Sequence, residues 1–423
     1  MKVLFSSADL ELKHKRGIGF YSKSLLKSLY DNGCENHLLT SCESSRETDI
    51  ISKISFGKNN KYTTKNKLLF LVRKTLIANR FFKKVVLNKQ KKTEEAPFLK
   101  YVKGFVNATL VFDIEYFWNK FIKARFRIPT KGFDVMITSI PSNLRVDKGT
   151  KLIQTLHDVI PLEESPLSGY GKVIRQMVKG MTENSDIILS VSEYSKNRLL
   201  SFFPETKADI IVTHQPIPVY PEEEQYVQDE SNVIRDLNKF ELQKGKYFLY
   251  VGAIEERKNI LTLIEAYNEV KSQLDIPLVI AGGVSEVDIE LHNKIEEIKR
   301  GDISGVKYLG YVSNTEKLSL LKGSLSFVFV SFSEGFGLPP LEAMKMGTPV
   351  ICSNKTSLPE VCGDAALLVE PTDVGEIGRK MLELYQNPIL RQDLIQRGYE
   401  NVKRFSFESY NKKISDVLRE VMR

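Results

Sequence analysis

The chain has 423 residues, of which 42% are hydrophobic and 27% charged, and its 61 Lys and Arg outnumber its 53 Asp and Glu. These proportions indicate a globular protein of two or three domains and exclude a chain that is disordered as a whole. The four cysteines lack the spacing of metal ligands, and a chain of this length needs no disulfide bonds, so reduced thiols are predicted. No apolar run in the sequence approaches the length of a membrane span.

The chain opens with a short apolar segment, residues 2–6, which predicts a buried strand and is too short for the core of a signal peptide. A loop with Gly17 and Gly19 follows, and residues 21–30 then carry leucines at helical spacing. A strand, a glycine-containing loop and a helix are typical of a dinucleotide fold, but the third glycine of that fingerprint is missing. By itself, this loop does not establish a phosphate site.

Residues 61–131 are strongly basic, with 18 Lys and Arg against 4 Asp and Glu, so the rest of the chain is slightly acidic. Apolar and aromatic residues are interleaved with these cations at 68–87 and 116–127. Basic amphipathic helices with aromatic residues suit an anionic membrane surface. Alternatively, the helices complete the first domain, and the sequence leaves both interpretations open. Nucleic acid is not a predicted partner, because no recognised binding motif accompanies the charge.

Strands are predicted at 133–139, 151–156 and 186–192. The second of them ends directly before His157. Open α/β sheets place their ligands at the carboxyl ends of strands, so His157 is a candidate site residue. Without further context, a single histidine is more often a surface residue or a hydrogen-bonded core residue.

Residues 216–244 contain three prolines and a run of glutamates with little apolar content, which predicts a linker between two domains. Residues 246–252 then predict the first strand and turn of a second domain, and Arg257 and Lys258 precede its first helix. Two adjacent cations in front of a helix suit a diphosphate. The alternative is a pair of solvated surface charges.

The most informative stretch is 324–352. It predicts a buried strand, a turn with two glycines, a helix with prolines in its first turn, and a second strand after Gly347. The backbone amides of Phe336, Gly337 and Leu338 lie at the helix start, where the helix dipole favours an anion.

A carboxylate lies on each side of these amides, Glu334 in the loop and Glu342 in the helix. Carboxylates accept hydrogen bonds from the vicinal hydroxyls of a sugar or a ribose. The combination therefore predicts a nucleotide-sugar site, in which the amides hold the diphosphate. The alternative is an ordinary strand–helix–strand crossover whose glutamates cap and solvate the helix.

The motif Ser-Glu-Gly-Phe-Gly-Leu-Pro-Pro-Leu-Glu-Ala, with seven residues between Glu334 and Glu342, resembles the paired-glutamate signature of retaining glycosyltransferases of family 4. The segments His157-Asp-Val-Ile-Pro and Gly252-Ala-Ile-Glu-Glu-Arg-Lys-Asn resemble that family as well. The resemblance covers nearly the whole chain except the basic segment and the predicted linker. It implies an α/β fold with two Rossmann-like domains facing each other across a cleft, the GT-B type.

This fold would divide the chain into an acceptor-binding domain, a linker and a donor-binding domain. The expected bounds are 1–215 for the first domain with its basic insertion 61–131, 216–244 for the linker, 245–404 for the second domain, and 405–423 for a terminal helix that crosses back to the first domain. The resemblance assigns the nucleotide-sugar donor mainly to the second domain.

The resemblance also implies roles for individual residues. Glu334 would orient the hydroxyls of the sugar, Glu342 would hold the ribose diol, and His157 would face the transferred sugar. Arg257, Lys258 and the amides would stabilise charge on the leaving phosphate. The catalytic set is His157, Arg257, Lys258 and Glu334. The donor-binding set is Gly17, Gly19, Gly252, Arg257, Lys258, Tyr311, Val312, Glu334, Phe336, Gly337, Leu338 and Glu342.

The implied reaction transfers a hexose with retention of anomeric configuration, and no metal cofactor is expected because no Asp-x-Asp cluster is present. The motifs are most like those of bacterial mannosyltransferases of polysaccharide assembly, so GDP-mannose is the expected donor, and UDP- and dTDP-sugars stay open. The acceptor would be a glycan or a polyprenyl-pyrophosphate-linked precursor of O-antigen or capsule, at the cytoplasmic face of the membrane. A nucleotide-sugar epimerase and a non-catalytic nucleotide-sugar-binding protein are the alternatives.

Overall fold

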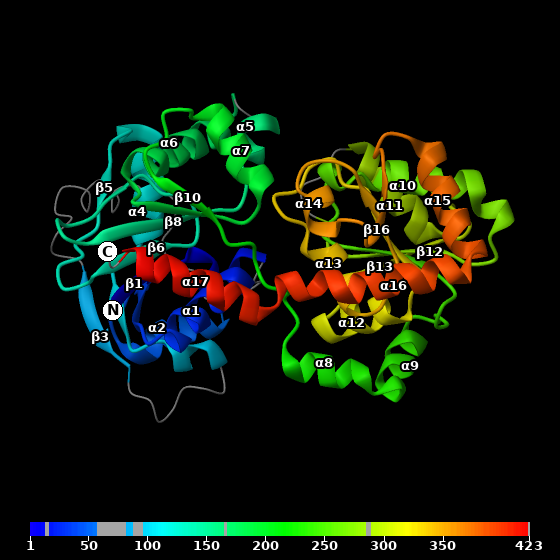
Figure 1. Ribbon diagram of the computed structural model, residues 1–423, viewed down its shortest axis with the longest axis horizontal. Coiled ribbons are helices and arrows are strands. Elements are labelled where there is room, and N and C mark those ends of the chain that lie inside the picture. Colours follow the sequence, from blue (N-terminus) through cyan, green and yellow to red (C-terminus); the bar gives the residue numbers. More distant parts are fainter. Residues whose placement is uncertain (13–16, 57–81, 88–95, 165–166, 285–288, 422–423) are drawn as a thin grey trace. The chain divides into compact units, whose positions relative to one another are not determined.

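The computed structural model divides the chain into two compact units, Met1–Pro216 with Phe407–Arg423, and Ile217–Ser406. The described residues are 1–12, 17–56, 82–87, 96–164, 167–284 and 289–421. Each unit is built on a sheet that is parallel or almost entirely parallel, with helices packed against it (Figure 1). This confirms the predicted α/β class with two Rossmann-like domains.

The sheet of the first unit has the strand order β10-β9-β8-β6-β1-β2-β4-β3, and only β3 runs antiparallel to its neighbour. Its strands are β1 (Lys2–Ser6), β2 (Glu35–Thr40), β3 (Lys83–Val86), β4 (Gly104–Asn107), β6 (Val135–Thr138), β8 (Lys151–Leu156), β9 (Ile187–Ser190) and β10 (Asp209–Val212). Two short strands, β5 (Phe126–Arg127) and β7 (Leu144–Arg145), pair separately. The central strands β1, β6 and β8 are almost entirely buried, because helices cover both faces of such a sheet.

Helices α6 and α7 lie on one side of this sheet, and α1 and α2 lie on the other (Figure 1). The helices of the unit are α1 (Gly17–Asp31), α2 (Glu47–Phe56), α4 (Val111–Phe117), α5 (Ile160–Glu164), α6 (Gly169–Asn184), α7 (Glu193–Phe202) and α17 (Phe407–Val421). The terminal helix, expected at 405–423, is α17, and it packs on α1. There, the Asn411 side-chain oxygen accepts hydrogen bonds from the Ser28 hydroxyl at 2.6 Å and from the Asn32 amide at 2.9 Å.

The sheet of the second unit has the order β13-β12-β11-β14-β15-β16, and all its strand pairs are parallel. Its strands are β11 (Phe248–Val251), β12 (Leu278–Ala281), β13 (Val306–Gly310), β14 (Ser326–Phe329), β15 (Val350–Ser353) and β16 (Ala366–Val369). Its helices are α8 (Pro221–Gln228), α9 (Glu230–Lys239), α10 (Ile260–Val270), α11 (Ile289–Arg300), α12 (Asn314–Gly323), α13 (Leu338–Lys345), α14 (Leu358–Cys362), α15 (Val374–Gln386) and α16 (Pro388–Val402).

The direction of the strand order in this sheet reverses between β11 and β14. Successive strands run outward from β11 in one direction and from β14 in the other. At such a switch point, the loops that follow the two neighbouring strands diverge and leave room for a ligand at the carboxyl ends. The loops after β11 and β14 are therefore the place where a site is expected.

The segment 216–244, predicted to be a linker, contains helices α8 and α9 of the second unit. Asp236 on α9 is fully buried and accepts hydrogen bonds from the Ser319 hydroxyl of α12 at 2.8 Å and from the Tyr226 hydroxyl at 3.0 Å. The glutamates that made the segment look like a linker lie in the first turn of α8, where the helix dipole favours negative charge.

Part of the basic segment 61–131 lies outside the described residues, including most of the predicted helical stretch 68–87. The last residues of the stretch 68–87 form the edge strand β3 and not the predicted helix. The second stretch, 116–127, continues α4 into a π-helix, Trp118–Ile122. Within the described ranges of the chain, no helix is both long enough and apolar enough to cross a bilayer.

Candidate active site

The two loops at the switch point of the second sheet carry the residues that were predicted to bind the phosphate and the sugar. The loop after β11 contains a short 3₁₀ helix, Glu256–Lys258, directly before α10. The loop after β14 leads into α13, which begins at Leu338. Because β11 and β14 are neighbouring parallel strands, their carboxyl ends emerge at the same edge of the sheet.

The structure brings Arg257, Lys258 and Glu334 into direct contact. The Lys258 ammonium lies 2.5 Å from Glu334 Oε1, and Arg257 Nη1 lies 3.2 Å from Glu334 Oε2. Arg257 Nη1 also donates to the Ser333 carbonyl at 3.0 Å. Side chains of Lys258 and Glu334 are each only 10% exposed, so this is a nearly buried cluster of two cations and one carboxylate.

The charge state of Glu334 follows from these contacts. Burial raises the pKa of its carboxyl, but the positive charges of Lys258 and Arg257 outweigh burial and leave the pKa below its ordinary value. Glu334 is therefore ionised at neutral pH. Both cations already have a carboxylate partner, which a bound diphosphate would have to share or displace.

The loop that carries Glu334 is fixed by the segment before α14. The Ser357 hydroxyl donates to the carbonyl oxygens of Glu334 and Phe336, both at 2.9 Å, and the Glu334 amide donates to the Thr356 hydroxyl at 3.1 Å. Gly337 has φ of +106°, and a Cβ there would lie 2.6 Å from Leu358. Only glycine is compatible with this turn, which brings the backbone into the first turn of α13.

Glu342, the second predicted carboxylate, lies on α13 and is also buried. Its Oε1 accepts a hydrogen bond from the Lys317 ammonium of α12 at 2.7 Å. Burial raises the pKa of Glu342 above its ordinary value, and Lys317 offsets only part of this effect. The two glutamates thus differ, since Glu334 has two cationic partners and Glu342 has one.

The remaining predicted donor residues of this unit lie on neighbouring loops. Gly252 packs directly against Gly282, whose Cβ, if present, would lie 1.7 Å from the Gly252 carbonyl oxygen. Tyr311 and Val312 connect β13 to α12, the helix that carries Lys317, and the Tyr311 side chain is 79% exposed. An exposed ring at this position is available for stacking on a planar ligand.

The other predicted residues belong to the first unit. His157 follows β8, and its Nε2 lies 3.0 Å from the Ser139 carbonyl oxygen, which can only accept a hydrogen bond. Its ring meets the edge of Tyr21 with centroids 4.9 Å apart. Burial lowers the pKa of His157 to about 4, so the imidazole is neutral at physiological pH, with the proton on Nε2 and an acceptor lone pair on Nδ1.

Gly17 and Gly19 were predicted to lie in a loop before a helix over 21–30. Instead, α1 already begins at Gly17, so both glycines form its first turn. The loop residues before them lie outside the described ranges. Tyr21 is in the next turn of α1 and contacts His157, so the start of α1 and the end of β8 are close together.

Several residues that support these positions were not predicted from the sequence, namely Ser139, Tyr21, Lys317, Thr356 and Ser357. Lys317 could have been found, because it directly precedes the mainly apolar residues 318–321, and a cation beside buried residues needs a charged partner. The contacts of Ser139 and Ser357 depend on the packing of distant segments, for which the sequence carries no local signal.

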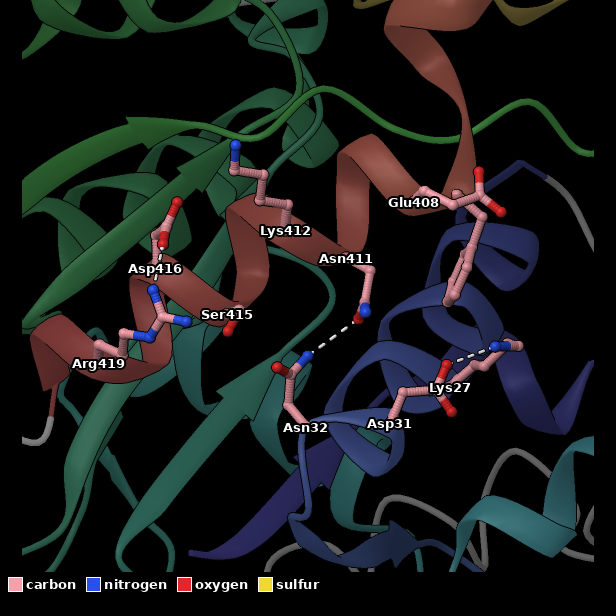
Figure 2. A pocket seen from close by; sticks show the side chains of 10 residues that line it. Lys27, Asp31, Asn32, Glu408, Asn411, Lys412, Ser415, Asp416 and Arg419 are labelled. Atoms are coloured by element: carbon pink, nitrogen blue, oxygen red, sulfur yellow. Dashed lines mark hydrogen bonds and ion pairs between the residues drawn. The ribbon is translucent and has the colours of Figure 1, made fainter.

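A separate cavity of about 490 Å³ lies between α1 and α17 in the first unit (Figure 2). Its polar lining includes the hydrogen bond between Asn32 and Asn411 and the ion pair of Asp416 with Arg419. None of the predicted site residues lines it. In the described part of the chain, no group of three or more His, Cys, Asp or Glu side chains could hold a metal ion.

Comparisons with known proteins identify a family for this chain. Residues 234–401 match the family described as glycosyl transferases group 1. The chain is 36% identical over 265 residues to O-antigen chain mannosyltransferase B of Escherichia coli, covering 61% of this chain and 68% of the relative. It is 23% identical to the serotype-specific mannosyltransferase WbdA of Escherichia coli over 93% of this chain, but it spans only 44% of that longer relative.

Among solved structures, the fold is similar to that of sucrose-phosphate synthase from Thermosynechococcus elongatus, with a TM-score of 0.65 and 16% identity. The match covers 100% of this chain and 99% of the other. At this level of identity, the likeness concerns the fold alone.

Proposed function

Because this chain belongs to the group 1 glycosyl transferases, we propose that it transfers mannose from GDP-mannose to a glycan or polyprenyl-pyrophosphate-linked acceptor. The product would be a precursor of bacterial O-antigen or capsule, made at the cytoplasmic face of the membrane. The relatives named as O-antigen chain and serotype-specific mannosyltransferases support the choice of sugar and pathway.

The observation that carries this proposal is the buried cluster of Arg257, Lys258 and Glu334 at the switch point of the second sheet. The two cations would bind the diphosphate of the donor, assisted by the backbone at the start of α13. Glu334 would then accept hydrogen bonds from hydroxyls of the mannose. Glu342, which lies on α13, would accept them from the ribose diol.

The proposed reaction retains the anomeric configuration. The bond between the anomeric carbon and the phosphate oxygen breaks, the acceptor oxygen bonds to the same face of that carbon, and the acceptor proton passes to the leaving phosphate. Arg257 and Lys258 would stabilise the negative charge that builds on this phosphate, so the proposal requires neither a positioned general base nor a metal ion. The neutral His157 would accept a hydrogen bond from a mannose hydroxyl at Nδ1.

Thermal-shift titration with GDP, UDP, dTDP and ADP tests the choice of base. GDP should stabilise the chain at the lowest concentration, and a preference for UDP or dTDP would contradict GDP-mannose as donor.

Incubation with GDP-mannose and a mannan acceptor, followed by NMR of the anomeric proton, tests retention. Conversion of the donor without any acceptor would indicate an epimerase, and binding without turnover would indicate a non-catalytic protein.

Membrane contact is part of this proposal. Phe121 and Ile122 are 61% and 43% exposed, and Lys120, Lys123 and Arg125 lie beside them, all exposed. Such a cluster suits an anionic lipid surface, where each cation contributes about 1 kcal/mol to binding.

We therefore expect the triple variant K120Q/K123Q/R125Q to bind vesicles with anionic lipid about 100-fold more weakly than the unmodified chain. A matched variant that neutralises Lys299, Arg300 and Lys403, exposed cations of the second unit, should bind normally. Equal losses of vesicle affinity in both variants would show that net charge alone causes the effect. No loss of affinity in K120Q/K123Q/R125Q would exclude this surface as the membrane contact.

His157 should also influence stability. Its folded pKa of about 4 lies below the unfolded value of about 6.5, so the unfolded chain binds the extra proton as pH falls from 6.5 towards 4. Above about pH 6.5, the imidazole is neutral in both states and costs no stability. As the pH falls from about 6.5 to about 4, the free energy of unfolding decreases by up to about 3 kcal/mol.

Urea unfolding between about pH 7.5 and pH 4.5 checks this effect. In the His157→Gln variant, the free energy of unfolding should fall less with decreasing pH than in the unmodified chain. Parallel pH curves for the two proteins would show that His157 is not buried as a neutral ring.

A further inference from the structure

The contact between Lys317 and Glu342 joins two helices of the second unit. Lys317 lies in the second turn of α12, and Glu342 lies in the middle of α13. The hydrogen bond of 2.7 Å between them is nearly buried, since the Lys317 side chain is 18% exposed and the Glu342 side chain 6%. A long, flexible lysine side chain loses its rotamer freedom in such a place, so the contact has to be favourable enough to offset this cost.

The negative charge of Glu342 depends on Lys317, because the other surroundings of this carboxyl disfavour its ionised form. Among the described residues, the charged groups that shift the pKa of Glu342 are Lys317 on α12 and Glu223 on α8. Burial and Glu223 both raise this pKa, and Lys317 alone opposes them. Without Lys317, Glu342 would be a buried carboxyl with a like charge nearby, which takes up a proton instead of remaining ionised.

We propose that Lys317 is a positioning residue for the donor: its ammonium fixes the Glu342 carboxylate as the acceptor of the two ribose hydroxyls. This inference rests on the proposed function, in which Glu342 holds the ribose. An ionised carboxylate has about four lone-pair positions, so the bond from Lys317 leaves acceptor capacity for both hydroxyls. A protonated carboxyl would lose part of that capacity and its negative charge.

Helix α12 is itself held at this end by α8. Glu223 of α8 accepts a hydrogen bond from the side-chain amide of Asn314, in the first turn of α12. It also accepts one, at 2.9 Å, from the backbone amide of Tyr220, the N-cap of α8. Ser313 caps α12 through a reciprocal pair of bonds with Glu316. The lysine therefore projects from a fixed helix end and not from a loose loop, as a positioning role requires.

The test compares nucleotides with and without the ribose hydroxyls. GDP and 2′,3′-dideoxy-GDP, with UDP and 2′,3′-dideoxy-UDP as a second pair, are titrated by calorimetry into the unmodified chain and Lys317→Met. In the unmodified chain, the ribonucleotide should bind about tenfold more tightly than its dideoxy form. In K317M, this ratio should collapse near neutral pH and recover as the pH is raised far enough to ionise Glu342 again.

Four further variants make the result specific. K317R keeps the charge and should keep most of the ratio. E342Q should abolish the ratio at every pH, and the K317M/E342Q double variant should bind no more weakly than E342Q alone, because the two residues act as one unit. Lys345→Met removes a cation from the same helix as Glu342, one that pairs with Glu224 at 2.9 Å, and should leave the ratio unchanged.

The outcomes separate the inference from the proposed function. If no nucleoside diphosphate binds the unmodified chain, the proposed function fails and the inference fails with it. If the ribonucleotides bind and K317M retains the full ratio at all pH values, the inference alone is wrong. A loss of affinity for ribo- and dideoxynucleotides alike would show a general structural role for Lys317 and would also overturn the inference.

Discussion

We expect the Lys258→Met variant to lower kcat/KM for the proposed mannosyl transfer by about 100-fold or more, because it loses one of the two cations assigned to the leaving phosphate. The Lys258 ammonium lies in a nearly buried site, where a charge is worth more than in water. Steady-state kinetics with GDP-mannose measure the effect. Turnover within about threefold of the unmodified chain would show that Lys258 does not contact the phosphate.

The same substitution should also destabilise the second unit. Glu334 then retains only Arg257, and a buried ion pair that loses one partner typically costs about 3 kcal/mol. Thermal unfolding without nucleotide measures this change, and saturating nucleotide separates it from catalysis. Lys355→Met is the matched control. Lys355 follows β15 in the same unit and also pairs with a carboxylate, Glu370, but it is more exposed than Lys258. It should change neither quantity.

Replacing Glu334 with Gln should move binding and transfer in opposite directions. Without nucleotide, the Glu334 carboxylate neutralises Lys258 and Arg257, so its removal frees positive charge for a diphosphate. We expect about tenfold tighter binding of GDP, which carries no sugar. Transfer should fall by about 100-fold, because the mannose hydroxyls lose the acceptor that orients them.

The control for Glu334 is Glu255. This carboxylate also pairs with Arg257, at 3.0 Å, but it is 32% exposed. E255Q should therefore have a small effect on both GDP affinity and transfer, since exposed pairs contribute little. If E334Q weakened GDP binding, the carboxylate would support the cations in place of competing with the diphosphate, and the assigned geometry of the pocket would be wrong.

Much of the fold could be predicted from the sequence because its strands are continuous apolar runs and its turns carry glycine and proline. The stretch 324–352 forms the predicted strand, turn, helix and strand, with Gly337 at positive φ and α13 starting at Leu338. Here, local preferences and the final fold agree, so the local pattern was sufficient.

Two local predictions differ from the structure for physical reasons. Helices α8 and α9 were not expected in 216–244, because few of their residues are apolar. Their stability depends on a small set of buried groups, Val227, Val233, Asp236 and Leu237. The start of α1 at Gly17 was not expected either, since glycine is a poor helix former and only the fold brings it into a first turn.

The candidate site itself could be predicted only in part. The residues Arg257 and Glu334 are 77 positions apart in the sequence, and their contact follows from β11 and β14 being neighbours in the sheet. Strand order is a property of the whole domain and cannot be read from either segment. The bond from Lys317 to Glu342 depends similarly on how α12 packs against α13.

If Arg257 and Lys258 hold the diphosphate of the donor, as we propose, most of the affinity for GDP should depend on these two cations. The most direct measurement is calorimetric titration of GDP into the unmodified chain and into the R257A/K258M variant, with thermal unfolding as a check of folding. We expect saturable binding by the unmodified chain and a loss of affinity of about 100-fold or more in the folded double variant. Equal affinity of the two proteins for GDP would contradict it.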